Sequence, residues 1–296
     1  MLSILIPTYN YNTFPLVQKL WKQCMDLEIE FEILCQDDGS LSALNLDNNE
    51  ISTLENCHFF ISQENLGRGK NINSLFKKSK YEWLLLLDCD VMPVSDKFIE
   101  TYLEMIKNPE VQVCYGGITY RRKRPENTDV LRWTYGHKRE DLPAEIRRKK
   151  PYQSSLTSNL LISSAVFKEN RFSAIITKYG YEDLVFFHDL KLKNIQIFHI
   201  ENPAVHINLD NSKTFLAKTR VGIENLDYLT NFEMVKGENR LLKQFSKVEK
   251  YGFTKTVSQL FDYFQQDMEI NLLSANPSMT VFDMYRLGYF SKLKEQ

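Results

Sequence analysis

The sequence predicts an α/β fold, a Rossmann-like, mainly parallel central sheet with flanking helices, followed by a helical C-terminal region. Apolar runs at residues 2–6, 31–35 and 83–87 each lead into a polar loop, a pattern that indicates buried strands. A glycine-containing turn at residues 65–73 then opens a helix, so strand, loop and helix recur in order up to residue 90. Such alternation is typical of a parallel sheet covered by helices.

Two carboxylates follow the most apolar run of the chain. Asp88 and Asp90 come directly after residues 83–87, which read Trp-Leu-Leu-Leu-Leu. Because burying unpaired charge is costly, the pattern favours a divalent cation that bridges the carboxylates to a phosphate. Mg²⁺ and Mn²⁺ prefer such oxygen ligands.

Polar loops also follow the other early strands, at what should be the same edge of the sheet. Residues 7–10, Pro-Thr-Tyr-Asn, end the first strand, and Asp37 and Asp38 end the second. Ligands bind at the carboxyl ends of the strands in open α/β sheets. Taken alone, Asp37 and Asp38 would also fit an ordinary acidic turn. Arg68 and Lys70 lie at a helix start, where they suit either a diphosphate or a plain cap.

Together these segments resemble the family 2 glycosyltransferases, which have the GT-A fold. The segments are S-I-L-I-P-T-Y-N at 3–10, Q-D-D-G-S at 36–40, N-x-G-x-G-x-x-x-N at 65–73 and D-C-D at 88–90. Farther along, Y-G-Y-E-D at 179–183 resembles the acceptor-side G-x-E-D motif of that family. His206 lies where many relatives carry a third metal ligand. The resemblance is strongest in the first ninety residues.

The resemblance implies a nucleotide-sugar donor. Its nucleotide would be held by Pro7, Thr8, Tyr9, Asn10, Asp37 and Asp38, with Arg68 and Lys70 near the diphosphate and donor sugar. Asp38 would contact the base, and Tyr9 would stack on it or meet its edge. A carboxylate accepts a hydrogen bond from the ring N–H of uracil or guanine, which neutral cytosine lacks. The carboxylate favours a UDP- or GDP-sugar over a CDP-sugar, and of these we expect a UDP-sugar.

The resemblance also implies a Mn²⁺ or Mg²⁺ cofactor. Asp90 would bind the metal directly, Asp88 would contact the ribose or the outer shell of the metal, and His206 would complete the protein ligands. The metal would act as a Lewis acid on the leaving diphosphate. An imidazole ligand suits Mn²⁺ better than Mg²⁺. A purely structural role for His206 stays open.

Glu182 and Asp183 are the acid-base candidates. The resemblance implies that Asp183 is the general base that deprotonates the acceptor hydroxyl and that Glu182 hydrogen-bonds the acceptor. Carboxylates at a helix start can also simply cap the helix. A single base with no separate nucleophile predicts inversion at the anomeric carbon.

Composition excludes some classes of partner. The net charge of −1 and the pI near 6.5 argue against nucleic acid. Five cysteines without C-x-x-C spacing predict free thiols in a reducing compartment. We expect no signal peptide, because residues 2–6 already form a strand, and no membrane span. The expected location is the cytoplasm, with contact at a membrane surface left open, as is the oligomeric state.

The sequence divides into a predicted catalytic domain, residues 1–208, and a helical C-terminal region, residues 209–296. The nucleotide-sugar half would reach about residue 115 and the acceptor half would span 116–208, taking a glycan or lipid-linked acceptor. Within it, residues 121–150 hold eleven Lys/Arg against five Asp/Glu. That stretch is either a solvated surface or a site for anionic groups. Apolar residues at helical spacing from 245 to 264 are expected to pack on the catalytic domain.

Two other functions remain as alternatives. A sugar-nucleotide pyrophosphorylase-like nucleotidyltransferase would ordinarily carry G-x-G-x-R after the first strand, where this chain has residues 7–10 instead. A non-catalytic sugar-nucleotide-binding protein of the same fold would lack some of the acids, whereas Asp38, Asp88, Asp90 and Asp183 are all present. A dinucleotide-dependent dehydrogenase is disfavoured, because no G-x-G-x-x-G follows a strand.

Overall fold

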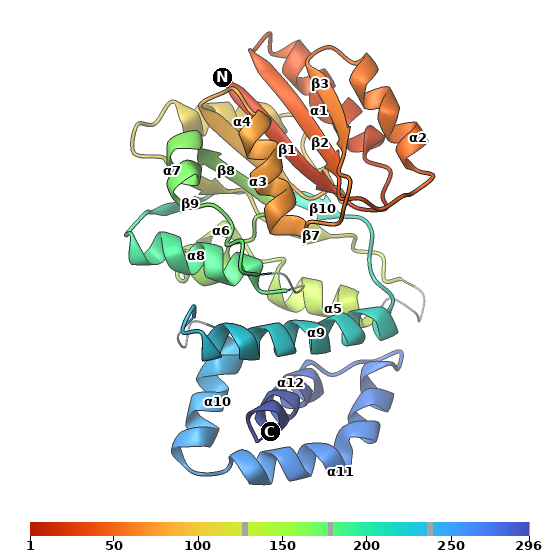
Figure 1. The fold of residues 1–296 in the computed structure, drawn as a ribbon, viewed down its shortest axis with the longest axis vertical. Coiled ribbons are helices and arrows are strands. Elements are labelled where there is room, and N and C mark those ends of the chain that lie inside the picture. Colours follow the sequence, from red (N-terminus) through yellow and green to blue (C-terminus); the bar gives the residue numbers. More distant parts are fainter. Residues whose placement is uncertain (126–129, 177–179, 236–238, 296) are drawn as a thin grey trace. The chain divides into compact units, whose positions relative to one another are not determined.

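A computed structural model describes residues 1–125, 130–176, 180–235 and 239–295 (Figure 1). The strands are β1 (Leu2–Thr8), β2 (Phe31–Asp37), β3 (Cys57–Ile61), β4 (Trp83–Leu87), β5 (Val91–Pro93), β6 (Val113–Tyr115), β7 (Ile118–Tyr120), β8 (Asn159–Ser163), β9 (Ile197–His199) and β10 (Ala204–His206).

Helices precede, separate and follow these strands. They are α1 (Phe14–Asp26), α2 (Asn45–Asn48), α3 (Arg68–Lys78), α4 (Phe98–Ile106), α5 (Val130–Arg139), α6 (Ala144–Arg148), α7 (Ser164–Glu169), α8 (Glu182–Leu192), α9 (Ser212–Asn231), α10 (Arg240–Lys250), α11 (Thr254–Leu272) and α12 (Met279–Lys294), with 3-10 turns η1 (Asn49–Thr53) and η2 (Pro151–Ser154).

The main sheet confirms the predicted fold class. Its order in the described part of the chain is β3-β2-β1-β4-β8-β6-β9. Strands β3, β2, β1 and β4 run parallel, β8 is antiparallel to both of its neighbours, and β6 and β9 are parallel. The register places Ile4 beside Leu85, so the two most apolar strands are neighbours, as predicted. Both are buried because helices such as α3 cover the sheet (Figure 1).

A small second sheet controls the position of the acidic turn. Its order is β5-β10-β7, and β10 runs antiparallel to β5, with His206 opposite Val91. Since β5 begins directly after Asp90, this pairing brings the end of β10 back to the end of β4. Two segments more than a hundred residues apart thus meet at the carboxyl edge of the main sheet.

The chain forms two compact units. The first comprises residues 1–119, 141–177 and 189–208, and the second comprises 120–140, 178–188 and 209–296. Residues 120–140 and 178–188, which the sequence-based division assigned to the acceptor half, are thus grouped with the C-terminal helices. The functional limits drawn from the sequence stay a prediction.

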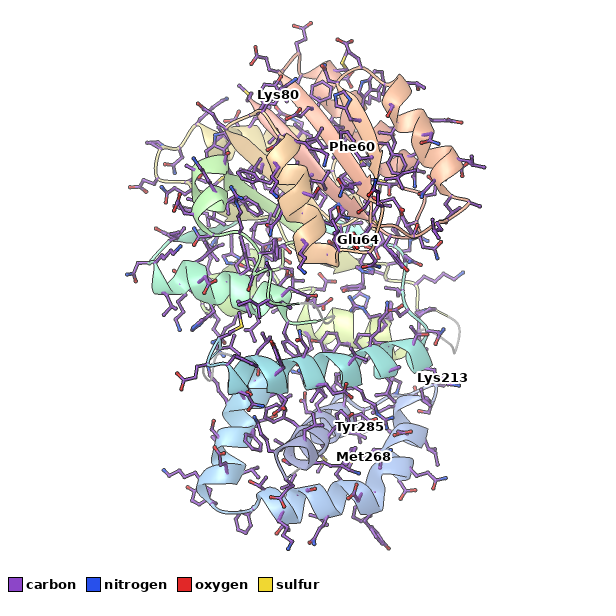
Figure 2. The ribbon with its side chains drawn as sticks, viewed as in Figure 1. Phe60, Glu64, Lys80, Lys213, Met268 and Tyr285 are labelled. Carbon is purple, nitrogen blue, oxygen red and sulfur yellow. The ribbon has the colours of Figure 1, made fainter. Side chains whose placement is uncertain are left out.

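The second unit has its own apolar core. α12 contacts α9, α10 and α11, and Tyr285 and Met268 lie within this helical bundle (Figure 2). The expectation that the apolar residues of 245–264 pack on the catalytic domain is corrected for two of them. The ring of Phe245 contacts Phe290, and the ring of Phe261 contacts Tyr285, both on α12. No helix in the described residues is both long and apolar enough to cross a membrane.

Four arginines of the basic stretch 121–150 bind other groups of the protein. Arg147 is buried, and its guanidinium donates to the carbonyl oxygens of Leu142, Tyr115, Gly116 and Ile200 at 2.8–3.2 Å. Other arginines of the stretch bind acids or carbonyl groups: Arg148 binds His199 O, Arg132 binds Glu140 and Arg139 binds Asp283. These four arginines therefore bind groups of the protein itself, and the role of the other cations of the stretch stays a prediction. The predicted free thiols are found, because all five cysteines are unpaired.

Candidate active site

The acidic turn lies at the carboxyl end of β4, in the middle of the main sheet. β4 pairs with β1 on one side and with β8 on the other, and the backbone N–H of Asp88 donates to Ser158 O at 3.3 Å, just before β8. The turn is therefore held from both neighbouring strands. Burial first, and then Asp90 and Asp88, raise the pKa of the intervening Cys89 thiol above its ordinary value.

Arg68 reaches the acidic turn from the first position of α3. Its Nε and Nη2 donate to one oxygen of Asp88 at 2.9 and 2.5 Å, and its Nη1 donates to the hydroxyl of Thr157 at 2.8 Å. Gly67, directly before the helix, has φ +81°, which a side chain would disfavour. The structure thus brings together two predicted site residues, Arg68 and Asp88, and adds the buried Thr157.

Asp90 lies against the predicted third ligand. His206 Nε2 is 3.5 Å from Asp90 Oδ2, and both side chains are largely but not fully buried. The backbone also joins the two segments, since Ile207 N donates to Asp90 O at 2.9 Å. Asp90 and His206 are thereby held side by side.

These groups fit a divalent cation that takes its remaining ligands from a diphosphate and water. In the described residues, no three His, Cys, Asp or Glu side chains cluster as a complete metal site. Adjacent ligands of an octahedral ion with bonds of about 2.1 Å are about 3 Å apart, and the Asp90–His206 separation of 3.5 Å is near that value. Asp88 is instead engaged by Arg68, which agrees with a contact outside the metal's inner shell.

Asp38 is tied to the loop that precedes α3. Its two carboxylate oxygens accept from the backbone N–H groups of Leu66 and Gly67 at 2.9 and 2.8 Å. Its own N–H donates to Thr8 O at 2.9 Å, so it also joins the ends of β1 and β2. Burial raises the pKa of the Asp38 carboxyl above its ordinary value, although the two N–H bonds act the other way. Asp38 therefore fixes the turn that carries Arg68.

Asp37 shapes the turn after β2. Its carboxylate accepts from the backbone N–H of Ser40 at 2.8 Å and from the Ser40 hydroxyl at 2.6 Å, and its side chain is buried. Gly39 has φ +67°, and a Cβ there would lie 2.7 Å from the carbonyl carbon of Glu64. Glu64 is labelled in Figure 2, in the segment between β3 and α3. The turn from Asp37 to Ser40 thus supports the neighbouring loop, which contains Glu64.

The loop after β1 offers an exposed aromatic ring. Pro7 and Thr8 are buried, and the Thr8 hydroxyl lies 3.1 Å from that of Thr13. Tyr9 and Asn10 are exposed, with Asn10 at φ +48°. Such an arrangement leaves the Tyr9 ring accessible to a ligand while the backbone beside it is fixed. Lys70 is half-buried on the first turn of α3.

Glu182 and Asp183 begin α8, in the second unit. Glu182 Oε2 accepts from the backbone N–H of Gly180 at 3.0 Å, so one oxygen of Glu182 closes its own turn. Gly180 and Tyr181 both have positive φ, +98° and +67°. The two acids are thus presented by a tightly bent turn, and their roles stay predictions.

A shallow groove lies elsewhere in the first unit, beside the outer strand β3. It is lined by residues of β2, β3 and α3, among them Gln36, Phe60, Ser74 and Lys78. Phe60 is labelled in Figure 2. None of the predicted donor or metal residues lines it. The groove is therefore not the site that the motifs indicate.

The sequence did not indicate the partners of Asn159, a residue that lies beside the site. Asn159 is buried at the start of β8, where its amide donates to Gly117 O and Asn202 O, and its Oδ1 accepts from Tyr102. A polar residue entering an apolar strand was the one available signal. Its three partners lie 42, 43 and 57 positions away, so the pattern along the chain did not reveal them.

The fold and this edge define a class. A mainly parallel sheet with an acidic turn, an arginine and a histidine gathered where its central strands end is an α/β protein of the GT-A type. The sequence model of Glycosyl transferase family 2 matches residues 3–175, more than half of the chain, and the chain belongs to that family. The resemblance seen in the motifs is confirmed. Glu182, Asp183 and His206 lie beyond the matched range.

Individual relatives are distant. An uncharacterised glycosyltransferase of Mycoplasma genitalium is 24% identical over 207 residues, which are 67% of this chain and 66% of that protein. The mannosyltransferase PcManGT from Pyrobaculum calidifontis, solved with GDP-Man and Mn²⁺, has a TM-score of 0.51 at 13% identity, covering 76% of this chain and 61% of that one. S. aureus TarS 1–349 has a TM-score of 0.48 at 18% identity, covering 100% of this chain and 92% of that one.

Proposed function

We propose that the chain is an inverting, metal-assisted glycosyltransferase that moves a sugar from a nucleotide diphosphate to a glycan or lipid-linked acceptor. The observation that carries the proposal is the group formed by Arg68, Asp88, Asp90 and His206 at the carboxyl edge of the sheet. It combines a cation for the diphosphate with carboxylate and imidazole groups for a metal. Family membership supports the same activity.

The donor would lie along the loops that follow β1, β2 and β4. Tyr9 and Asp38 would contact the base, and Asp38 would also hold the turn that carries Arg68. Asp90 and His206 would bind Mn²⁺ or Mg²⁺, which supplies Lewis-acid stabilisation of the leaving diphosphate when bound. The Mn²⁺ and GDP-Man in the P. calidifontis mannosyltransferase agree with such a donor and metal. UDP and GDP both carry the ring N–H that a carboxylate can bind.

The acceptor hydroxyl would lose its proton to Asp183. Glu182 uses one oxygen in its own turn, at 3.0 Å from Gly180 N, and the family pattern selects the second acid, Asp183, as the base. Attack by the acceptor oxygen on the anomeric carbon forms the new glycosidic bond while the bond to the diphosphate breaks. One displacement inverts the configuration.

A membrane-bound, lipid-linked acceptor is favoured by the surface of α10 and α11. Lys243, Lys247 and Lys250 recur at helical spacing on α10 and are exposed; we call them the basic stripe. Exposed apolar side chains also lie on and directly before α11; we call them the apolar stripe. They are Phe253, which caps α11, and Leu260 and Phe264 within it. Lysines beside exposed apolar rings are typical of helices that lie on anionic membranes.

The direct test is donor cleavage. UDP-glucose, UDP-galactose, UDP-GlcNAc and GDP-mannose are incubated with the protein, with Mn²⁺ or with excess chelator, and the release of nucleoside diphosphate is measured. We expect release with at least one donor, only with metal. Release of pyrophosphate from a sugar phosphate and a nucleoside triphosphate would instead identify a nucleotidyltransferase. Binding without any turnover, with acceptors supplied, would identify a non-catalytic sugar-nucleotide-binding protein.

A further inference from the structure

We infer that helices α9 and α12 position the catalytic turn, with Asn225 and Arg286 as positioning residues. The catalytic turn is the segment from Gly180 to Asp183, and this inference rests on the proposed role of Asp183. All of these residues belong to the second unit. The C-terminal helices would therefore be part of the machinery for acceptor deprotonation.

The catalytic turn has a backbone that needs support. Tyr181 adopts φ +67°, in the left-handed region that a residue with a side chain rarely occupies. Gly180, with φ +98°, precedes it. Such conformations persist only where the surroundings hold them. The contacts around the turn should therefore decide where Asp183 points.

α9 supports the turn through its backbone. A Cβ on Gly180 would lie 3.0 Å from the Cα of Gly222, so the turn and the helix approach as closely as two glycines allow. One turn farther along α9, the buried Asn225 donates from its side-chain amide to Gly180 O. The carbonyl group directly before the strained Tyr181 is thereby fixed to a helix.

α12 supports the turn through a side chain. Arg286 Nη2 donates to the hydroxyl of Tyr181 at 2.8 Å. The guanidinium also lies over the ring of Phe282, with 5.6 Å to its centroid, so the arginine itself is held in place. A charged donor makes a stronger hydrogen bond than a neutral one. Tyr181 is thus held on two sides. Asn225 binds the backbone carbonyl directly before it, and Arg286 binds its hydroxyl.

The experiment compares Arg286→Met and Tyr181→Phe, singly and together, using the donor that gives the fastest cleavage in the panel above. Each single variant should lower kcat by roughly 10- to 100-fold, the scale of an error of about 1 Å in position. The donor dissociation constant should be unchanged, because the predicted donor loops lie in the first unit. The double variant should be no worse than the single ones, since both remove the same hydrogen bond. Arg286→Lys keeps a charged donor and should recover part of kcat.

A matched control is Arg240→Met. Arg240 is also an arginine of the helical unit and binds Asp283 of α12 at 2.9 Å, so its variant loses an ion pair to the same helix but keeps the bond from Arg286 to Tyr181. Its kcat should match wild type. Amide hydrogen exchange gives a second readout without substrate: peptides covering residues 180–186 should exchange faster in Arg286→Met but not in Arg240→Met.

Two results would overturn the inference while leaving the proposed function intact. One is loss of activity in Asp183→Asn with kcat near wild type in Arg286→Met. The other is an equal loss in Arg286→Met and Arg240→Met, which would show general destabilisation. If Asp183→Asn itself turns over like wild type, the assignment of the base fails, and the positioning role fails with it.

Discussion

Single residues of the acidic turn have distinct tasks although they look alike in sequence. Asp88 forms an ion pair with Arg68, whereas Asp90 lies beside His206. The carboxylate oxygen of Asp90 lies 3.5 Å from the imidazole nitrogen of His206, a separation near that of two neighbouring ligands of one ion. This placement supports the proposal that Asp90 is the inner ligand.

Asp90→Asn should abolish activity. The amide keeps the size of the side chain but removes the negative charge that a divalent cation prefers. Activity and Mn²⁺ affinity, measured by titration calorimetry, should both fall. Asp96→Asn is the matched control, because Asp96 is an exposed acid paired only loosely with Lys19 at 3.3 Å. Full turnover by the wild-type protein in excess chelator would contradict the metal site.

Asp183→Asn should reduce turnover roughly 100-fold or more, the usual scale for loss of a general base. Donor binding, measured by calorimetry, should change little, because Asp38, Asp88 and Asp90 are unaltered. Glu182→Gln is the comparison, and it should be the milder change. If Glu182→Gln removed activity and Asp183→Asn did not, the two roles would be reversed.

At the scale of elements, β6 and β9 are joined by a buried cation. Arg147 binds carbonyl groups at the ends of both strands, and its guanidinium lies over the Tyr115 ring, 5.0 Å from the centroid. His199, on β9, is buried beside it. Burial first, and then the nearby Arg147, lower the pKa of His199 to about 4.

This lowered pKa predicts acid sensitivity. The folded protein holds His199 neutral, whereas the unfolded chain binds the proton with a pKa near 6.5. Stability from this group is thus complete above about pH 6.5 and is lost as the pH falls toward 4. From pH 7.5 to pH 5 the loss should be about 2 kcal/mol. Urea unfolding at both pH values measures it. In His199→Gln the pH dependence should shrink by that amount, and an unchanged dependence would show that other groups cause it.

The elements near the site were predictable to different degrees. Strands β1, β2 and β4 follow from local apolar runs, and the loops after them follow from the polar residues that end those runs. The pairing of Arg68 with Thr157 did not follow, because 89 residues separate them and only the register of β4 with β8 brings them together. Arg147 was misjudged for a related reason. A basic run looks solvated in sequence, and only the fold shows that it binds carbonyl groups.

At the scale of the whole molecule, the two compact units carry different parts of the proposed reaction. The predicted donor and metal residues belong to the first unit, and the predicted base belongs to the second. The division at residue 208 that composition suggested did not foresee this, because residues 178–188 lie before the boundary in sequence but join the helical unit. The turn at Gly180 is bound to α9 by Asn225, 45 positions away, which no local pattern indicates.

The second unit also carries the surface that we assign to an anionic membrane. The basic stripe of α10 and the apolar stripe of α11 meet at a turn with two exposed rings, Tyr251 and Phe253. Exposed acids on these helices are Glu249, Asp262 and Asp267, and Asp262 is neutralised by Lys292 at 2.5 Å. The positive charge of the basic stripe is thus only partly offset.

Vesicles therefore provide the last test, by sedimentation of the full chain with phosphatidylcholine alone or with added phosphatidylglycerol. We expect binding only to the anionic vesicles, and weaker binding at high salt.

Changing Lys243, Lys247 and Lys250 to Gln should weaken vesicle binding roughly 100-fold, at about 1 kcal/mol per lysine. The control removes three exposed lysines of the first unit, Lys22, Lys77 and Lys97, and should bind like wild type. Leu260→Ser should weaken binding without a change in net charge, because it removes apolar contact with the bilayer. If vesicles do not bind, and Leu260→Ser instead converts a dimer to a monomer, the surface belongs to a second copy of the chain.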